Sequence, residues 1–129
     1  MEKQKTIFVV DDDPFITNLV AKRLANEGYI VEAFDFGEDC LESLKKNPDI
    51  IILDYYFHKP EGGVMNGMEI LNKIREVDPD MPVIILSGQD KGEIVLELAR
   101  KGINDYIIKD NNIIDNLKVA IGEIFESTE

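Results

Sequence analysis

The sequence predicts an α/β fold, a doubly wound sandwich of three layers in which helices cover both faces of a five-stranded parallel sheet. Two features of the 129 residues predict this fold. Five apolar runs alternate with segments of helical periodicity, and four of these runs are almost continuous in valine, isoleucine, leucine and phenylalanine. Unbroken apolar strands are typical of a parallel sheet that is buried on both faces.

The five strand candidates are short and spread over the whole chain. We expect them at residues 6–10, 30–34, 49–53, 82–87 and 105–108. A helical segment follows each of them, and right-handed crossovers through such helices make the strands parallel. The carboxyl ends of the strands should therefore meet at one edge of the sheet, which is where such folds bind their ligands.

Apolar residues in the helical segments recur at spacings of three and four, which gives each helix one apolar stripe. The stripes are formed by Ile16, Leu19, Val20 and Leu24; by Leu41 and Leu44; by Ile70, Leu71 and Ile74; by Ile94, Val95, Leu98 and Ala99; and by Leu117, Ala120, Ile121, Ile124 and Phe125. Helix ends are also marked. Asp13 suits an N-cap before Pro14 at the first helical position, and Gly28 and Gly102 stand where helices are expected to end.

Length and composition limit the classes of function. We expect a single domain over residues 1–129, with a core from about residue 5 to about residue 125. The 26 acidic and 14 basic residues give a net charge of −12, which argues against direct binding to nucleic acid or anionic membranes. No apolar run approaches the roughly 20 residues that span a bilayer. The single cysteine, Cys40, is expected to pack as a small apolar residue, and a cytoplasmic location is predicted.

Carboxylates follow two of the strand candidates. Asp11, Asp12 and Asp13 come directly after the first, and Asp54 comes directly after the third. Clustered carboxylates in a partly dry crevice repel one another, so such a group normally holds a divalent cation, shares protons or places a nucleophile. Oxygen ligands favour Mg²⁺, with Mn²⁺ as a substitute, over Zn²⁺. Asp13 is set apart, because a helix N-cap before proline is the simpler role for it.

Two further polar residues belong to the same edge of the predicted sheet. Ser87 ends the fourth strand and Lys109 follows the fifth. Either residue alone would be an ordinary strand-end hydroxyl or a solvated surface lysine. Beside a metal site, however, a lysine and a hydroxyl would face the anion that the metal holds. Together the residues describe a clamp for a phosphoryl group.

Five motifs in the chain resemble the receiver domain of bacterial response regulators, and the resemblance covers essentially the whole sequence. The motifs are VVDDDP at residues 9–14, IILD at 51–54, NGME at 66–69, PVIILSG at 82–88 and KGINDYIIK at 101–109. Each motif alone is weak, but their order and spacing match the family. The resemblance implies a flavodoxin-like sheet with strand order 2-1-3-4-5 and five helices.

The resemblance also implies a role for each acidic residue of the site. Asp54 would accept a phosphoryl group as a carboxylate nucleophile. Asp12 would bind Mg²⁺ directly, and Asp11 would act mainly through water. Asp54 and the backbone carbonyl of Tyr56 would complete the protein ligands.

The remaining roles concern the phosphoryl group and the response to it. Lys109 and Ser87 would each bind a phosphoryl oxygen. The bond to Ser87 would let Tyr106 swing toward the core and remodel the surface of the fourth helix, fifth strand and fifth helix. Tyr56 and Gln89 stand two residues after the phosphoacceptor and the hydroxyl, where this family tunes phosphoryl lifetime. The bulk of Tyr56 is expected to slow hydrolysis.

The implied function is that of a signalling phosphoprotein in a two-component system. Such a protein assists its own phosphorylation and dephosphorylation and is not otherwise an enzyme. Its partners would be a sensor histidine kinase or phosphotransfer protein, and a downstream effector or fused output domain. A homodimer through the fourth helix, fifth strand and fifth helix is compatible with the sequence, whereas direct contact with nucleic acid or membrane is not expected.

Two departures from the family pattern are specific to this chain. Residues 55–66 are about five residues longer than the usual receiver segment, and a pair of glycines within them suggests a mobile flap. Asp110 stands where the family commonly has proline. The Lys109–Asp110 peptide bond is therefore expected to be trans, which leaves the direction of the Lys109 side chain open.

Three rival functions fit the sequence less well. A haloacid-dehalogenase-type phosphatase needs a second acid two residues after its nucleophile, where this chain has Tyr56. Dinucleotide binding is disfavoured because Gly62-Gly63-x-x-x-Gly67 has the wrong spacing and does not open directly from a strand. The third rival is a receiver-like interaction module that acts without phosphate, and phosphorylation of Asp54 separates it from the receiver interpretation.

Overall fold

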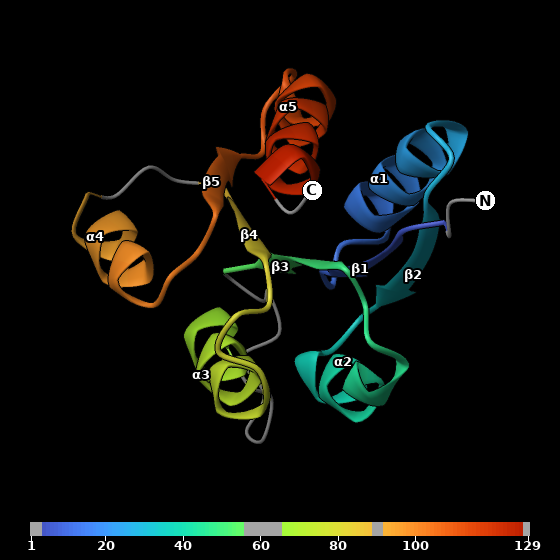
Figure 1. Ribbon diagram of the computed structural model, residues 1–129. Coiled ribbons are helices and arrows are strands. Elements are labelled where there is room, and N and C mark those ends of the chain that lie inside the picture. Colours follow the sequence, from blue (N-terminus) through green and yellow to red (C-terminus); the bar gives the residue numbers. More distant parts are fainter. Residues whose placement is uncertain (1–3, 56–65, 89–91, 128–129) are drawn as a thin grey trace.

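The computed structural model describes residues 4–55, 66–88 and 92–127, in which strands and helices alternate along the chain (Figure 1). The strands are β1 (Thr6–Val10), β2 (Ile30–Phe34), β3 (Ile50–Asp54), β4 (Val83–Ser87) and β5 (Asp105–Ile108). The helices are α1 (Pro14–Asn26), α2 (Gly37–Glu42), the 3₁₀ helix η1 (Leu44–Lys46), α3 (Gly67–Val77), α4 (Gly92–Arg100) and α5 (Ile113–Ser127). None of the helices in the described ranges is long and apolar enough to cross a membrane.

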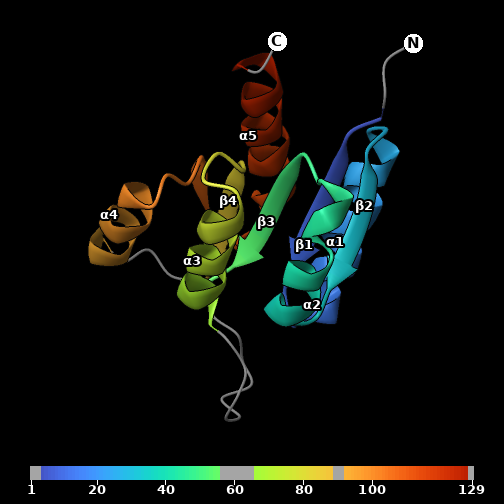
Figure 2. The same cartoon turned by 60° about the horizontal axis from the view of Figure 1, so that its bottom comes forward.

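The five strands form one parallel sheet in the order β2-β1-β3-β4-β5. The arrows of β1, β2 and β3 point the same way in Figure 2. The predicted fold class and strand order are therefore confirmed. Two strands begin one residue later than expected, at Ile50 and Val83, and β3 extends to Asp54. The extension places Asp54 within the ladder, where it pairs with Leu86 of β4.

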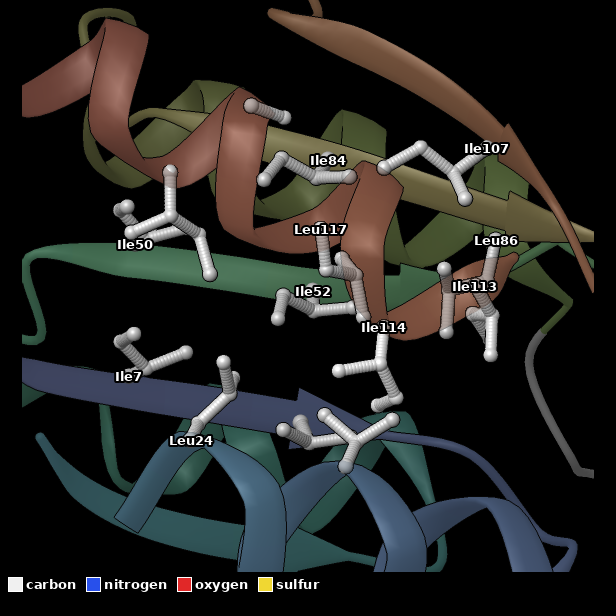
Figure 3. Close-up of a cluster of buried hydrophobic side chains, with 14 of the residues drawn as sticks. Ile7, Leu24, Ile50, Ile52, Ile84, Leu86, Ile107, Ile113, Ile114 and Leu117 are labelled. Atoms are coloured by element: carbon white, nitrogen blue, oxygen red, sulfur yellow. The ribbon is translucent and has the colours of Figure 1, made fainter. Parts of the chain in front are cut away.

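Successive residues of each inner strand enter two apolar clusters, one on each face of the sheet. In β1, Ile7 belongs to the first cluster and Phe8 to the second, as the two-residue period of a strand requires. Helices α1 and α5 cover the first face, while α2, α3 and α4 contribute to the second (Figure 1). Figure 3 shows the first cluster, in which Leu24 of α1 and Leu117 of α5 lie among isoleucines of the sheet.

The ends of α1 and α4 follow the signals in the sequence. The Asp13 side chain accepts a hydrogen bond from the Phe15 backbone N–H at 2.9 Å, and α1 begins at Pro14, so the predicted N-cap is confirmed. Gly28 and Gly102 lie just beyond α1 and α4, with φ angles of 95° and 79°. This left-handed conformation ends a helix, and glycine adopts it without a steric penalty.

Helix α3 begins with a capping box that we did not assign from the sequence. The Asn66 side chain accepts a hydrogen bond from the Glu69 backbone N–H at 2.9 Å. The Glu69 carboxylate accepts one from the Asn66 backbone N–H at 3.1 Å. The spacing of the two residues in the NGME motif was the available signal. The box fixes the point at which the chain enters α3 after the long segment of residues 55–66.

Cys40 of α2 is fully buried in the second cluster. Burial raises the pKa of its thiol to about 12. The thiol is therefore neutral at physiological pH, and its expected role as a small apolar residue is confirmed.

Candidate functional site

The polar residues predicted at the strand ends meet at the carboxyl edge of the sheet. Backbone hydrogen bonds continue the ladder just beyond the strands and hold these positions. The Asp11 N–H donates to the Phe34 carbonyl at 3.1 Å, and the Lys109 N–H donates to the Ser87 carbonyl at 2.8 Å. Tyr55 directly follows β3, and its N–H donates to the Leu86 carbonyl of β4 at 2.9 Å. These bonds tie Asp11, Tyr55 and Lys109 to the neighbouring strands.

Three carboxylates lie together at this edge. Asp11 and Asp54 are almost completely buried, with 0% and 1% exposure, and Asp12 is half-buried. One oxygen atom from each lies within 4.8 Å of the others. Like charges this close and this poorly hydrated destabilise one another, so the arrangement favours a bound cation. Asp13 is not in this group and serves as the α1 cap.

Lys109 forms ion pairs with two of the three acids. Its Nζ lies 2.8 Å from Asp11 Oδ2 and 3.0 Å from Asp54 Oδ1, and its side chain is 14% exposed. Burial by itself would lower the pKa of Lys109. The hydrogen bond to Asp11 and the charges of Asp54 and Asp11 outweigh burial, and together they raise this pKa above its usual value of 10.5. Lys109 is therefore a firmly charged part of the site, not a solvated surface lysine.

The charges and ligand atoms of the site suit a hard divalent cation. The single positive charge of Lys109 offsets one of the three carboxylate charges in this group of four side chains. A divalent cation would offset the other two. Carboxylate oxygens are the donors that Mg²⁺ and Mn²⁺ prefer. Asp11, Asp12 and Asp54 therefore fit the predicted metal.

Ser87 ends β4, the strand next to Asp54, and Tyr106 lies on β5, the strand beyond it. Ser87 is fully buried and pairs in register with Ile108, one residue before Lys109. Tyr106 pairs with Ile85, and its half-buried ring packs against the second apolar cluster. The Ser87 hydroxyl and the Tyr106 ring are therefore carried by adjacent strands.

Asp110 does not turn Lys109 away from the acids. The Lys109–Asp110 peptide bond is trans, as expected, because the described residues contain no cis peptide bond. The Asp110 N–H donates to the Ile108 carbonyl at 2.9 Å, and its side chain accepts from the Asn112 N–H at 2.8 Å. Asp110 thus forms the tight turn that leads into α5, while Lys109 points to the site.

Gly67 is a structural residue of the site to which the sequence analysis assigned no role. Its N–H donates to the Tyr55 carbonyl at 3.1 Å. A Cβ atom at this position would lie 2.6 Å from Tyr55 backbone atoms and 2.7 Å from the Asp54 carbonyl oxygen. Only glycine fits there, so the start of α3 packs directly on the backbone that carries Asp54.

The predictions for Tyr56 and Gln89 concern residues outside the described ranges. The flap of residues 55–66 also lies outside them, except for its two ends, Tyr55 and Asn66.

Comparison with known proteins identifies the class of protein that carries this fold and site. The chain matches the response regulator receiver domain over residues 7–121. It belongs to this family, and it is a receiver domain of the two-component response regulators, a signalling domain.

Individual relatives support this assignment. The chain is 33% identical over 122 residues to the nitrogen assimilation regulatory protein NtrX of Azorhizobium caulinodans, covering 94% of this chain and 26% of that protein. A CheY-like receiver domain from Methanospirillum hungatei has a TM-score of 0.81 at 27% identity, covering 96% of both chains. The BeF3-activated receiver domain of DrrB, a Thermotoga maritima regulator, has a TM-score of 0.82 at 29% identity, covering 96% of this chain and 99% of that one. The chain spans less than half the length of the curated regulators that it matches.

Proposed function

We propose that this domain accepts a phosphoryl group on Asp54, in a Mg²⁺-dependent reaction, from a sensor histidine kinase or a phosphotransfer protein. One observation carries the proposal. The buried Asp54 carboxylate lies 3.0 Å from the Lys109 ammonium and belongs to a cluster of three carboxylates with oxygens within 4.8 Å of one another. A buried carboxylate, an ammonium group and a set of carboxylate oxygens thus occupy one edge of the sheet, and phosphoryl transfer to an aspartate needs these three kinds of group.

The transfer is a displacement at phosphorus. An Asp54 carboxylate oxygen forms the new O–P bond, and the N–P bond of the phosphohistidine breaks with its electron pair left on the imidazole nitrogen. Lys109, which holds Asp11 and Asp54 before the reaction, is close enough to bind a phosphoryl oxygen afterwards. The Ser87 hydroxyl, on the adjacent strand end, would bind another.

Asp11, Asp12 and Asp54 would hold the metal ion, together with the Tyr56 backbone carbonyl. When bound, Mg²⁺ would neutralise charge on the phosphoryl oxygens, as in other phosphoryl-transfer sites. The protein side chains contribute the rest. Burial keeps bulk water from Asp54, and Lys109 supplies a fixed positive charge beside the attacking carboxylate.

Phosphorylation at the site would change the surface of the protein that a partner binds. We propose that residues 1–129 act as one receiver domain in the cytoplasm, in which phosphorylation recruits Ser87 and shifts Tyr106. The surface of α4, β5 and α5 would then be read by an effector, a fused output domain or a second copy of the chain. Tyr56 and Gln89 would set the lifetime of the phosphoryl group, which the domain itself helps to form and hydrolyse. We expect no direct binding to nucleic acid or membrane.

Intact-mass spectrometry tests this function. The parent protein is incubated with Mg²⁺ and acetyl phosphate, a small phosphodonor, and should gain the mass of one phosphoryl group. Asp54→Asn should gain none. Asp13→Asn is the matched control, because asparagine is also a good N-cap and Asp13 lies outside the acid cluster, so this variant should be labelled like the parent.

Two results would count against the proposal. A parent protein that stays unmodified would favour an interaction module that acts without phosphate. Labelling that persists in Asp54→Asn would place the phosphoryl group on another residue.

The likeness to a BeF3-activated receiver supports the proposal, because beryllofluoride resembles a phosphoryl group in shape and charge.

A further inference from the structure

Arg75, near the C-terminal end of α3, binds two turns at the edge of the sheet opposite to the candidate site. Its Nη1 donates to the Met81 carbonyl at 2.7 Å and to the Asp78 carbonyl at 3.4 Å. Its Nε donates to the Lys101 carbonyl at 2.8 Å, and its Nη2 donates to the Gly102 carbonyl at 3.0 Å. One guanidinium group thus joins the end of α3, the turn before β4 and the turn between α4 and β5.

The charge of Arg75 makes these bonds strong. Burial lowers the pKa of Arg75, while the charges of Asp78 and Asp80 raise it, and an arginine stays protonated at neutral pH. Hydrogen bonds from a cation to carbonyl groups are shorter and stronger than neutral ones. Lys101 and Gly102 directly follow the last residue of α4, so the positive charge also complements the negative end of the α4 helix dipole.

A second set of contacts holds the same end of α4. Asn104, in the turn before β5, donates its backbone N–H to the Val83 carbonyl at 2.8 Å. Its side-chain oxygen accepts the Val83 N–H at 3.0 Å. Leu98, in the last turn of α4, is completely buried in the second apolar cluster. The C-terminal end of α4 is therefore joined to α3, to β4 and to the core.

The described residues at the N-terminal end of α4 are less buried than its C-terminal end. None of the described residues from 92 to 97 is fully buried: Ile94 is half-buried against the second apolar cluster, and Leu96 is 62% exposed. This end of the helix is the one that follows β4, whose last residue is Ser87. In Figure 1 and Figure 2, α4 lies on the β5 side of the molecule, well apart from α5. Among the described residues, the fully buried side chain of α4 and the bonds from Arg75 are thus both at the end of the helix far from the site.

We propose that Arg75 fixes the C-terminal end of α4 as a pivot, so that a change at Ser87 turns α4 about this end instead of displacing the whole helix. The motion rests on the function proposed above. The anchor does not, because Arg75 makes its four bonds in the unmodified protein. Hydrogen exchange of backbone amides, resolved by mass spectrometry of peptides, tests the two parts separately.

The first experiment compares the unmodified parent, Arg75→Met and Arg100→Met. Arg100 is the exposed last residue of α4 and serves as the matched control. Amides of residues 101–104 should exchange on the order of tenfold faster in Arg75→Met, because hydrogen bonds to a charged group are lost there. Amides of β1 and α1 should change little. Equal exchange of residues 101–104 in both variants would overturn the anchor.

Should Arg75→Met fail to fold, Arg75→Lys replaces it. Lysine keeps the charge but cannot bridge carbonyls of both turns, so a smaller acceleration confined to residues 101–104 is expected. A uniform acceleration over the whole chain would mean that Arg75 only adds stability, and it would overturn the anchor as well.

The second experiment adds beryllofluoride and Mg²⁺ to the parent and to Arg75→Lys. In the parent, exchange should change in residues 92–97 and stay constant in residues 101–104. In Arg75→Lys, the change should extend into residues 101–104. A change that reaches residues 101–104 in the parent would overturn the pivot. A parent that does not respond anywhere would contradict the proposed function and with it the motion, while the result for the anchor would stand.

Discussion

Replacement of Gly67 by alanine tests how tightly α3 packs on the backbone of the site. Gly67 is the first residue of α3, and its N–H donates to the Tyr55 carbonyl at 3.1 Å. A Cβ atom would lie 2.6 Å from the Tyr55 Cα and carbonyl oxygen and 2.7 Å from the Asp54 carbonyl oxygen. These are backbone atoms, which cannot rotate away as a side chain can. The start of α3 must therefore move relative to β3.

The distances give the size of the effect. Ordinary contacts of a Cβ atom begin near 3.4 Å, so the two backbones must separate by roughly 0.8 Å. Overpacking of this kind costs about 1–3 kcal/mol, and the higher helix propensity of alanine returns less than about 1 kcal/mol. We expect Gly67→Ala to lower the free energy of unfolding by about 2 kcal/mol, which corresponds to a Tm lower by roughly 7 °C for a domain of this size.

Gly122→Ala is the matched control. Gly122 lies within α5, and a Cβ atom there would meet nothing within 4 Å. Helix propensity alone then applies, and this variant should gain up to about 1 kcal/mol. Urea unfolding followed by circular dichroism measures both variants. Helix propensity predicts that both substitutions raise the free energy of unfolding. The structure predicts that Gly67→Ala lowers it and that Gly122→Ala raises it.

The displacement in Gly67→Ala should also affect phosphorylation, because the new Cβ atom would press on the Asp54 carbonyl. The rate of labelling by acetyl phosphate should fall in Gly67→Ala and stay at the parent level in Gly122→Ala. The reasoning is refuted if Gly67→Ala is as stable as the parent, since the close approach of α3 to Asp54 and Tyr55 would then be absent in solution.

Other predictions concern the charges of the site and the buried thiol. Lys109→Met should lower the free energy of unfolding by about 3 kcal/mol without metal, because Asp11 and Asp54 lose their buried partner, and Mg²⁺ should restore more stability to this variant than to the parent in urea titrations. Equal stabilisation by Mg²⁺ in both proteins would argue against the charge balance described above. Asp12→Asn should raise metal-free stability by about 1 kcal/mol and weaken Mg²⁺ binding measured by calorimetry; a loss of stability would show that repulsion does not dominate at Asp12. From Cys40 alone, stability should fall by about 1 kcal/mol between pH 9 and pH 10 and then by about 1.4 kcal/mol per pH unit, because the unfolded thiol ionises near its usual pKa of 9.0 while the buried thiol stays neutral to about 12. In Cys40→Ala the free energy of unfolding should fall less steeply with pH than in the parent. Equal slopes for the two proteins between pH 9 and pH 10 would contradict the burial of the thiol.

Much of the site was predictable because parallel topology converts sequence order into spatial proximity. Short runs such as Ile50-Ile51-Ile52-Leu53 are typical of an inner strand, and the residues that follow such strands meet at one edge. Asp11, Asp54 and Ser87 could therefore be grouped without coordinates. The Asp13 cap was predictable for a different reason, since an N-cap depends only on the next two or three residues.

The sequence by itself determined the fold class, the edge at which the site lies and the acids that form it. Only the tertiary structure decided that Lys109 reaches both Asp11 and Asp54, that Gly67 packs on the Asp54 backbone, and that Arg75 holds the end of α4. Hydrophobic periodicity and capping are local patterns that each segment carries in its own residues. A salt bridge, a close backbone contact or a bridging guanidinium group depends on distances between segments far apart in the chain, and these distances are fixed only when the core is packed.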